Sequence, residues 1–248
     1  MGRAKEIIVK VIPSNIANEF VKKHHYSGKV VQNSSIHFGC FLNGVLHGVM
    51  SFGPSLDKSK VIGLVNNTGW NEFIELNRMA FDEYLPRNSE SRCISIAIKL
   101  IKKNAPQIKW VISFADGMQC GDGTIYRASG FKLTGFSSGS MWRLPENLAK
   151  LNNGEIAHRM KIQDKCSAIS RHILSKTNGK NLTMDNYVNI FGGELLDGYM
   201  LRYIYFIDKS KEKDLTVPII PFSKIDELNA GMYKGKKISI GDRKNAVE

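Results

Sequence analysis

Residues 73–116 read FIELNRMAFDEYLPRNSESRCISIAIKLIKKNAPQIKWVISFAD, and the fold class follows from this stretch. Its start, FIELNRMAF (73–81), predicts a strand, and the polar turn PRNSESR (86–92) leads into a predicted helix over 91–104. IKWVISFAD (108–116) predicts a buried strand that ends on an acid. Two strands joined by a helix predict a mixed α/β layer built on one sheet.

The residues before this stretch extend the same layer. EIIVKVI (6–12) predicts a short strand, and an amphipathic helix is predicted to follow it. IHFGCFL (36–42) and VLHGVMSF (45–52) predict a β-hairpin, because the Asn43-Gly44 pair between them supplies the positive φ angles of a two-residue turn. Residues 53–70 are rich in Gly, Asn and Ser and predict an inserted loop.

The pattern weakens towards the C-terminus. GTIYRASGF (123–131) predicts a short helix, and further strands are expected through residue 142. HRMKIQDKCSAISRHILSK (158–176) predicts one basic helix, MLRYIYFID (200–208) a strand, and LTVPIIPFSKIDEL (215–228) an extended path because of its prolines. The last fourteen residues are expected to fray.

These elements predict two parts of the chain. We expect a catalytic core over residues 1–144. Residues 145–248 are expected to form a C-terminal α/β extension that packs on this core, because a strand such as MLRYIYFID needs a sheet to join.

Composition and charge narrow the class of protein. A hydrophobic fraction of 42% in 248 residues excludes wholesale disorder, and no apolar run is long enough for a transmembrane helix. The N-terminus predicts a strand and not a signal peptide. The four cysteines include no Cys-x-x-Cys pair, which favours a reduced cytosolic chain. A net charge of +12 suggests a polyanionic partner, nucleic acid first, although an ordinary basic protein stays open.

Five segments carry a resemblance to a known family. They are HHYSG (24–28), FGCFLNGVLHGVMSFG (38–53), IELNRMAFDEYLPRNSESRCIS (74–95), IKWVISFADG (108–117) and IYRASGF (125–131). Together, and in this order, they resemble the phage Mom family of adenine-modification proteins. YRASGF is also similar to the Tyr-x-x-x-Gly-Phe motif of the GNAT acyltransferase superfamily. The resemblance implies a GNAT-like mixed central sheet flanked by helices.

The resemblance also implies an activity. Members of the Mom family convert adenine in double-stranded DNA to N6-carbamoylmethyladenine, which protects phage DNA from host restriction. For this chain it implies a DNA-modifying transferase in the cytoplasm of the infected bacterial host, with double-stranded DNA as partner and no membrane. The oligomeric state stays open.

The turn before the helix over 91–104 is a candidate donor site, because a helix N-terminus binds anions. Its candidate residues are Asn88, Ser89, Glu90, Ser91 and Arg92. GNAT proteins usually have glycines here to approach the pyrophosphate of coenzyme A, and this turn has none. The alternative interpretation is a plain capping turn with Ser89 as the N-cap and Arg92 on the surface.

The candidate catalytic residues are His25, Tyr26, Ser91, Asp116 and Tyr126. Asp116 ends a buried strand, where it could accept a proton from an exocyclic amine or simply cap the next turn. Tyr126 matches the GNAT tyrosine that protonates a leaving group, and an unperturbed phenol with a pKa of about 10 donates at neutral pH. An ordinary packed aromatic is the alternative. His25 is expected to titrate near neutral pH, and Tyr26 could stack on a flipped base.

Other residues are candidates for contacts with substrate. Asn77 on the strand over 73–81 and Ser27 after the first helix are the candidate substrate contacts. Residues 75 and 77 are expected to share one face of that strand, and a structural ion-pair partner is an equally good interpretation of Arg78. His24 is expected to be structural, and His37 and His47 on the hairpin are expected to be packed or solvated. The basic residues expected to contact DNA phosphates are Lys22, Lys23, Lys29, Arg87, Arg159, Lys161, Lys165 and Arg171.

The product implied by the resemblance limits the donor. A carbamoylmethyl group contains the atoms of a glycyl group in reverse order, so an activated glycine such as glycyl-tRNA is a candidate donor, and an acyl-coenzyme A is the alternative. The metal requirement is open, because no Cys/His spacing predicts a site, although distant residues such as His25 and Asp116 could assemble one. Two other functions stay open: a GNAT acyltransferase acting on a small amine or a protein lysine, and a DNA-binding protein without catalysis.

Overall fold

The computed structural model describes residues 3–119, 121–152, 154–228, 232–234 and 236–238. These residues fall into two compact units that alternate along the chain. Unit 1 comprises Met1–Ala115, Gln119–Phe136 and Leu201–Lys224, and unit 2 comprises Asp116–Met118, Ser137–Met200 and Ile225–Glu248. The boundary expected at residues 144 and 145 stays a prediction.

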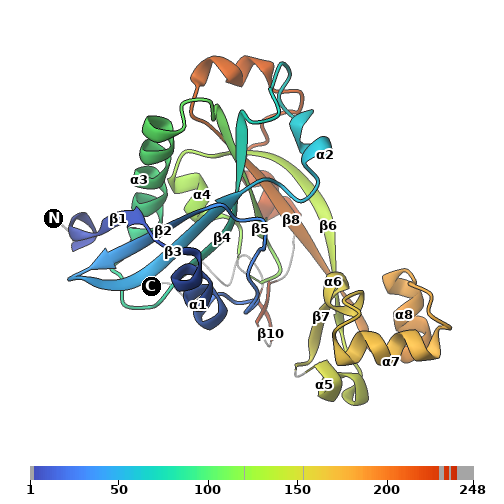
Figure 1. Cartoon of the computed structure of the whole chain (residues 1–248). Coiled ribbons are helices and arrows are strands. Elements are labelled where there is room, and N and C mark those ends of the chain that lie inside the picture. Colours follow the sequence, from blue (N-terminus) through green and yellow to red (C-terminus); the bar gives the residue numbers. More distant parts are fainter. Residues whose placement is uncertain (1–2, 120, 153, 229–231, 235, 239–248) are drawn as a thin grey trace. The chain divides into compact units, whose positions relative to one another are not determined.

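Unit 1 has a mixed sheet covered by helices. Its elements are η1 (Arg3–Glu6), β1 (Ile8–Val11), α1 (Ser14–His24), β2 (Ile36–Leu42), β3 (Val45–Gly53), α2 (Lys58–Ile62), β4 (Phe73–Phe81), α3 (Ser89–Asn104), β5 (Trp110–Asp116, whose last residue belongs to unit 2), α4 (Thr124–Ala128), the first part of β6 (Lys132–Arg143), the last part of β8 (Glu194–Phe206) and η2 (Lys209–Asp214). The strand order is β1-β2-β3-β4-β5-β8-β6. This arrangement confirms the predicted mixed α/β sheet flanked by helices (Figure 1).

Helices α1 and α3 cover opposite faces of this sheet. Ala17 and Val21 of α1 pack with Val49 and Phe41 of the hairpin. Cys40 precedes Phe41 on β2 and contacts Cys93 of α3 instead, because successive side chains of a strand point to opposite faces. Both thiols are buried and unoxidised, and this mutual contact raises the pKa of Cys40.

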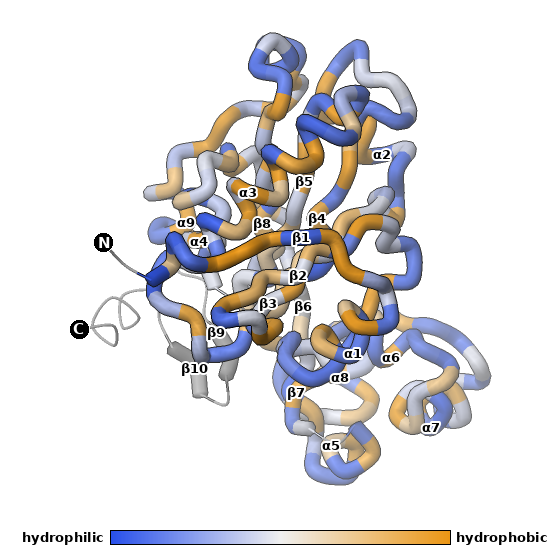
Figure 2. The backbone as a smooth tube through the Cα atoms, turned by 60° about the vertical axis from the view of Figure 1, so that its left-hand side comes forward, coloured by the Kyte–Doolittle hydropathy of each residue, from blue (hydrophilic) through white to orange (hydrophobic). Residues whose placement is uncertain are grey.

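The hairpin forms as its sequence predicts. Asn43 and Gly44 have φ angles of 51° and 80°, and β2 pairs with β3 antiparallel. β1 pairs with β2 at the edge of the sheet and is largely apolar (Figure 2), with Ile8 64% exposed and Val11 67% exposed.

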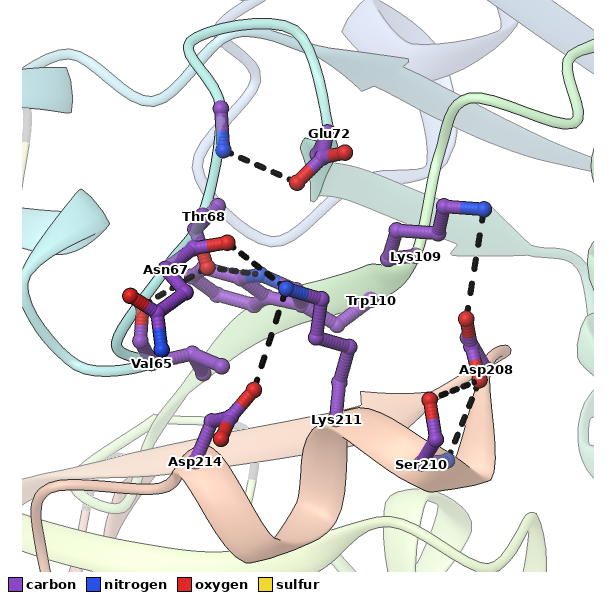
Figure 3. A network of polar contacts seen from close by, with 11 residues as sticks. Val65, Asn67, Thr68, Glu72, Lys109, Trp110, Asp208, Ser210, Lys211 and Asp214 are labelled. Carbon is purple, nitrogen blue, oxygen red and sulfur yellow. Dashed lines mark hydrogen bonds and ion pairs between the residues drawn. The ribbon is translucent and has the colours of Figure 1, made fainter.

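A polar network ties the 63–72 segment to η2 (Figure 3). The indole of Trp110 donates to Thr68 Oγ1 at 3.2 Å, and Lys211 Nζ donates to the Asn67 carbonyl at 2.6 Å. Trp110 also stacks on Phe73 at 4.5 Å between ring centroids. Residues 53–70 therefore form more than the predicted loop: they include α2, and Val65 is 1% exposed.

Two features of β4 open the sheet in the middle. β4 and β5 are parallel, and their register ends at Glu75 and Ile112 although both strands continue. On its other side, β4 pairs with β3 through a bulge, because Ser51 is opposite Arg78 and Phe52 is opposite Leu76. Asn77 is the extra residue of this bulge, so the alternation that placed residues 75 and 77 on one face does not hold there.

Unit 2 contains the helices that follow β6. Its elements are α5 (Glu146–Asn152), β7 (Ile156–His158), α6 (Arg159–Ile162), α7 (Ala168–Lys176), α8 (Met184–Phe191), the remaining parts of β6 and β8, α9 (Ser223–Glu227, whose last residues belong here), β9 (Met232–Lys234) and β10 (Lys236–Ile238). Trp142, Leu148, Ile173 and Tyr187 form the centre of its core. The single basic helix predicted over 158–176 is wrong: Asp164 accepts a turn hydrogen bond from the Cys166 amide, and Ser167 caps a new helix. Most of the last fourteen residues lie outside the described part of the chain.

Candidate functional site

The candidate site lies where β4 and β5 part. Ser113 of β5 has its Oγ 2.8 Å from the Leu76 carbonyl oxygen of β4 and 2.9 Å from the Tyr126 hydroxyl of α4. All three residues are buried and belong to unit 1. The structure thus brings the predicted Tyr126 to the point at which the sheet opens.

Asn77, the bulge residue beside Leu76, is also buried at this point. It is 9% exposed, and its Oδ1 accepts a hydrogen bond from Ser34 Oγ at 2.8 Å. Its Nδ2 group has no hydrogen-bond partner among the described residues. An unpaired buried amide donor costs free energy, so Asn77 has the property expected of a group that binds a ligand.

The ring of Tyr126 is held from several sides. Its helix begins after Gly123, which has a φ of 76°, and Asp122 Oδ1 accepts hydrogen bonds from the Thr124 amide and hydroxyl. Tyr203 stacks on Tyr126 with 5.1 Å between ring centroids, and the Tyr203 hydroxyl donates to the Asp122 carbonyl. The aromatic contacts predicted as the alternative role of Tyr126 are therefore present, together with the hydrogen bond to Ser113.

Arg78 holds the loop that follows α1. Its Nε donates to the Lys29 carbonyl at 2.9 Å, and its Nη1 donates to the Asn77 carbonyl at 2.7 Å. One side chain thus connects the bulge with the loop that carries His25, Tyr26 and Ser27. Arg78 is thus structural, but its partners are carbonyl groups and not the carboxylate of an ion pair, and no sequence pattern predicts a carbonyl partner 49 residues away.

His25 does not have the predicted pKa near neutral pH. Burial, and secondarily the charge of Arg78, lowers the pKa of His25 from 6.5 to about 4. Its Nδ1 accepts the Ser27 amide proton at 3.1 Å and lies 2.8 Å from Ser27 Oγ, so the ring proton is on Nε2. At neutral pH His25 is a neutral imidazole that offers a donor N–H, while its other nitrogen is already engaged.

This pKa predicts an effect of acid on stability. The unfolded chain takes up the His25 proton first as the pH falls, so the contribution of the neutral ring is complete above pH 6.5 and is lost between pH 6.5 and about 4. We therefore expect His25→Gln to lose less stability than the wild-type chain as the pH falls from 6.5 to about 4. Urea unfolding at a series of pH values measures the difference, and two parallel curves would contradict the low pKa.

Three other histidines, His24, His37 and His47, contact neighbouring side chains. His24 stacks on Phe20 of its own helix with 4.3 Å between ring centroids. His37 Nδ1 lies 2.8 Å from Ser51 Oγ, and burial lowers the pKa of His37. His47 Nδ1 lies 2.8 Å from Asp82 Oδ2. Tyr26, in contrast, is 49% exposed, and the centroid of its ring lies 4.2 Å from that of the His25 ring.

The predicted donor turn is partly rearranged. The N-cap of α3 is Asn88, which has a φ of 67°. The alternative interpretation, in which Ser89 is the N-cap, is therefore wrong. Ser89 is fully buried and its hydroxyl donates to the Pro86 carbonyl. Arg92 Nη2 donates to the Lys5 carbonyl at 3.2 Å, whereas its buried Nε has no hydrogen-bond partner among the described residues.

An open pocket of about 380 Å³ runs along this part of α3. Its polar and charged lining residues are Lys5, Asn88, Ser91, Arg92, Ser95 and Lys99. The lining thus contains three cations and no acid, and Glu90 is not part of it. The structure therefore brings together three of the five predicted donor-binding residues and adds two lysines.

Asp116 belongs to unit 2 and forms the turn predicted as its structural role. It is 6% exposed, and its Oδ1 accepts a hydrogen bond from the Met118 amide at 3.0 Å. Its catalytic role stays a prediction. Within the described residues, no group of three or more His, Cys, Asp or Glu side chains could hold a metal ion.

Of the eight basic residues predicted to bind DNA, four lie in unit 1 and four in unit 2. In unit 1, Lys22, Lys23, Lys29 and Arg87 are exposed. In unit 2, Arg159, Lys165 and Arg171 are exposed, although Arg171 Nη1 also donates to the Cys166 carbonyl. Lys161 is half-buried, and its Nζ donates to the Asn152 carbonyl. Lys161 therefore also has a structural role. In the part of the chain that the structure describes, no helix has the length and apolar character needed to cross a bilayer.

Two sequence comparisons agree on the relationship of this chain to known proteins. The model of the Mom protein family matches residues 6–224. The methylcarbamoylase Mom of Escherichia phage Mu is 30% identical over 217 residues, which cover 87% of this chain and 82% of the phage protein.

Solved structures with lower similarity are acetyltransferases. One from Bacillus subtilis, in complex with CoA, is 9% identical, with coverage of 81% of this chain and 97% of that chain and a TM-score of 0.41. A GNAT family acetyltransferase from Elizabethkingia anophelis with acetyl-CoA bound is 12% identical, with coverage of 81% and 98% and a TM-score of 0.42.

Proposed function

Because this chain belongs to the Mom protein family, we propose that it converts adenine in double-stranded DNA to N6-carbamoylmethyladenine and thereby protects phage DNA from host restriction. The phage Mu relative is named a methylcarbamoylase, which supports a transferase of this type. The reaction takes place in the cytoplasm of the infected bacterium, where the phage DNA is replicated.

The observation that carries the proposal is the buried, unpartnered amide of Asn77 at the bulge of β4. An enzyme that modifies a base inside a duplex has to flip it into a pocket and bind its polar edge there. Asparagine pairs well with adenine because its amide offers one donor and one acceptor. The unpartnered Nδ2 of Asn77 supplies the donor, and the exposed ring of Tyr26 offers a surface on which the flipped base stacks.

The donor binds at the N-terminal part of α3. The pocket lined by Lys5, Arg92 and Lys99 suits the phosphates of a nucleotide-linked donor. Either glycyl-tRNA or an acyl-coenzyme A satisfies this chemistry, and the composition of the product favours the glycyl donor. Asn88 has the left-handed backbone that glycine adopts readily.

The proposed reaction has two steps. In the first, adenine N6 attacks the glycyl carbonyl, which forms the amide N6–CO–CH2–NH2 and releases the donor hydroxyl of the tRNA. In the second, the free amine attacks C6, a C6–N bond forms, and the bond from C6 to the amide nitrogen breaks. The result is C6–NH–CH2–CO–NH2, in which the original N6 has become the carboxamide nitrogen.

DNA is held by the exposed lysines and arginines. Lys22, Lys23, Lys29 and Arg87 of unit 1 and Arg159, Lys161, Lys165 and Arg171 of unit 2 neutralise phosphates, so binding weakens steeply as the salt concentration rises. Asp116 is proposed to act on the exocyclic amine while one of its oxygens accepts the Met118 amide.

The donor can be tested with isotope-labelled glycine. Purified protein, plasmid DNA and glycyl-tRNA charged with glycine labelled in both carbons and the nitrogen are expected to give a deoxyadenosine that carries all three labels, with the labelled nitrogen attached to C6. Uncharged tRNA with the same free glycine is the control. Modification of DNA with every glycine-bearing donor excluded would contradict the glycyl donor.

A further inference from the structure

Two unpaired polar groups lie next to each other just after β3. Asn33 Oδ1 and Ser55 Oγ are buried, and neither atom has a hydrogen-bond partner among the described residues. Asn33 Nδ2 donates to the carbonyl of Pro54, the neighbour of Ser55, at 2.6 Å. A carbonyl oxygen can only accept, so this bond fixes the orientation of the Asn33 amide and leaves Oδ1 as its unpaired atom. Buried polar groups without partners are rare in proteins, and a site for a ligand accounts for them.

The side chain of Glu75 projects towards the same place. Glu75 is directly opposite Gly53 in the antiparallel pairing of β3 and β4, and the side chains of directly opposite residues lie on the same face of a sheet. A methyl group on Gly53 would overlap the carbonyl oxygen of Asn33 and would lie 2.8 Å from the Ser34 Cα. The 33–34 segment therefore covers the face from which the Glu75 side chain projects.

The carboxyl group of Glu75 is close to Ser55 and has no cation bound to it. Burial raises the pKa of Glu75, and the Ser55 hydroxyl and the charge of Arg78 oppose this rise only in part. Arg78, whose guanidinium group donates to two backbone carbonyls, forms no ion pair with Glu75 within the described residues. An additional cation beside this carboxyl group would stabilise its charged form.

These three side chains match the hydrogen-bonding pattern of a primary ammonium group, which has three N–H donors and no acceptor. The acceptors are a carboxylate oxygen of Glu75, Asn33 Oδ1 and Ser55 Oγ, and Ser55 can still donate its own proton to the carboxylate. Asn33 and Glu75 are half-buried, so rotation of these two side chains admits a small group. We propose that Glu75, Asn33 and Ser55 form a binding site for a primary ammonium group, which is the α-ammonium of an aminoacyl donor. The identity of the donor rests on the proposed function.

The ammonium site adjoins the amide proposed to bind the adenine. Ser34, which follows Asn33, donates to Asn77 Oδ1 at 2.8 Å. An ammonium group at Glu75 and a base at Asn77 are therefore neighbours, as the two reactants of a glycyl transfer have to be. The site selects aminoacyl donors over acyl groups that lack an amine, because an acyl group without an amine leaves the buried acceptors unpaired.

Binding of glycinamide to the full chain, followed by NMR chemical shifts at about pH 7, tests the site without any reaction. Glycinamide carries an ammonium group at this pH, and the control acetamide has the same amide without the ammonium group. We expect glycinamide to bind in the millimolar range and acetamide not to bind. Equal binding of both compounds, or binding of neither, would overturn the proposal.

Three variants test the residues of the ammonium site. Glu75→Gln replaces the carboxylate with a neutral amide of the same size and is expected to weaken glycinamide binding at least about 10-fold. Ser55→Ala removes one acceptor without changing the charge and is expected to weaken binding about 5-fold. Glu19→Gln makes the matched change at an exposed position of α1 and is expected to leave binding unchanged. Folded Glu75→Gln protein that binds glycinamide as the wild-type chain does would overturn the proposal.

The ammonium site and the proposed function fail in different experiments. Selective binding of glycinamide by a chain that leaves adenine unmodified with glycyl-tRNA would support the ammonium site and contradict the proposed function. Adenine modification with the same KM for glycyl-tRNA in the wild-type chain and in Glu75→Gln would overturn the ammonium site and support the proposed function.

Discussion

Asn77→Asp is expected to reduce adenine modification by about 100-fold or more. The substitution keeps the size of the side chain and an oxygen that accepts the hydrogen bond from Ser34. It replaces the unpartnered Nδ2 donor with a carboxylate oxygen, which can only accept when ionised. Removing one preorganised donor from an active site typically costs about 100-fold to 1,000-fold in rate.

A surface asparagine provides the matched control. Asn104 at the end of α3 is exposed, and its Nδ2 donates to the Leu100 carbonyl at 2.8 Å. Asn104→Asp makes the same chemical change outside the site and is expected to leave modification unchanged. Nucleoside analysis of plasmid DNA from cells with equal amounts of folded protein measures both variants. Equal activity of the two variants would contradict a role of Asn77 in binding the base.

Arg78→Met is expected to lower both stability and activity. The variant removes the hydrogen bonds from the guanidinium group to the Lys29 and Asn77 carbonyls, and hydrogen bonds from charged groups contribute about 1.5–3 kcal/mol each. We expect the free energy of unfolding to fall by about 2–3 kcal/mol, since water replaces part of the loss at this half-buried site. The loop with His25 and Tyr26 is then no longer held, and modification is expected to fall at least about 10-fold.

Arg127→Met is the control for the loss of an arginine. Arg127 is exposed and lies over the Phe222 ring, 4.9 Å from its centroid. Its loss is expected to change the free energy of unfolding by less than about 1 kcal/mol. Urea unfolding measures the stability of both variants. An Arg78→Met protein with unchanged unfolding and unchanged modification would contradict the anchoring role.

The parts of the fold predicted from sequence are those with local signals. The Asn43-Gly44 turn, the strand over 73–81 and the Gly130 that closes α4 depend on the residues themselves, and each is found where expected. The basic helix over 158–176 was wrong because the turn at Asp164 and the cap at Ser167 are short-range polar contacts that periodicity does not detect.

The candidate site was predictable only in part, because most of its residues are informative only through contacts with distant parts of the chain. Tyr126 belongs to a recognisable motif, whereas Ser113 is one small residue in a hydrophobic strand and becomes informative only through its contacts with Leu76 and Tyr126. The bulge at Asn77 depends on how β3 pairs with β4, and Arg78 acts through backbone carbonyls. Such contacts join distant parts of the chain and leave no pattern in the local sequence.

Nucleoside mass spectrometry on plasmid DNA from bacteria that express this chain tests the proposed function most directly. The account predicts a deoxyadenosine with the additional mass of a carbamoylmethyl group, and its loss in Asp116→Ala and Asn77→Asp. Unmodified deoxyadenosine in cells that contain the folded, DNA-binding protein would contradict the account and leave a DNA-binding protein without this catalysis.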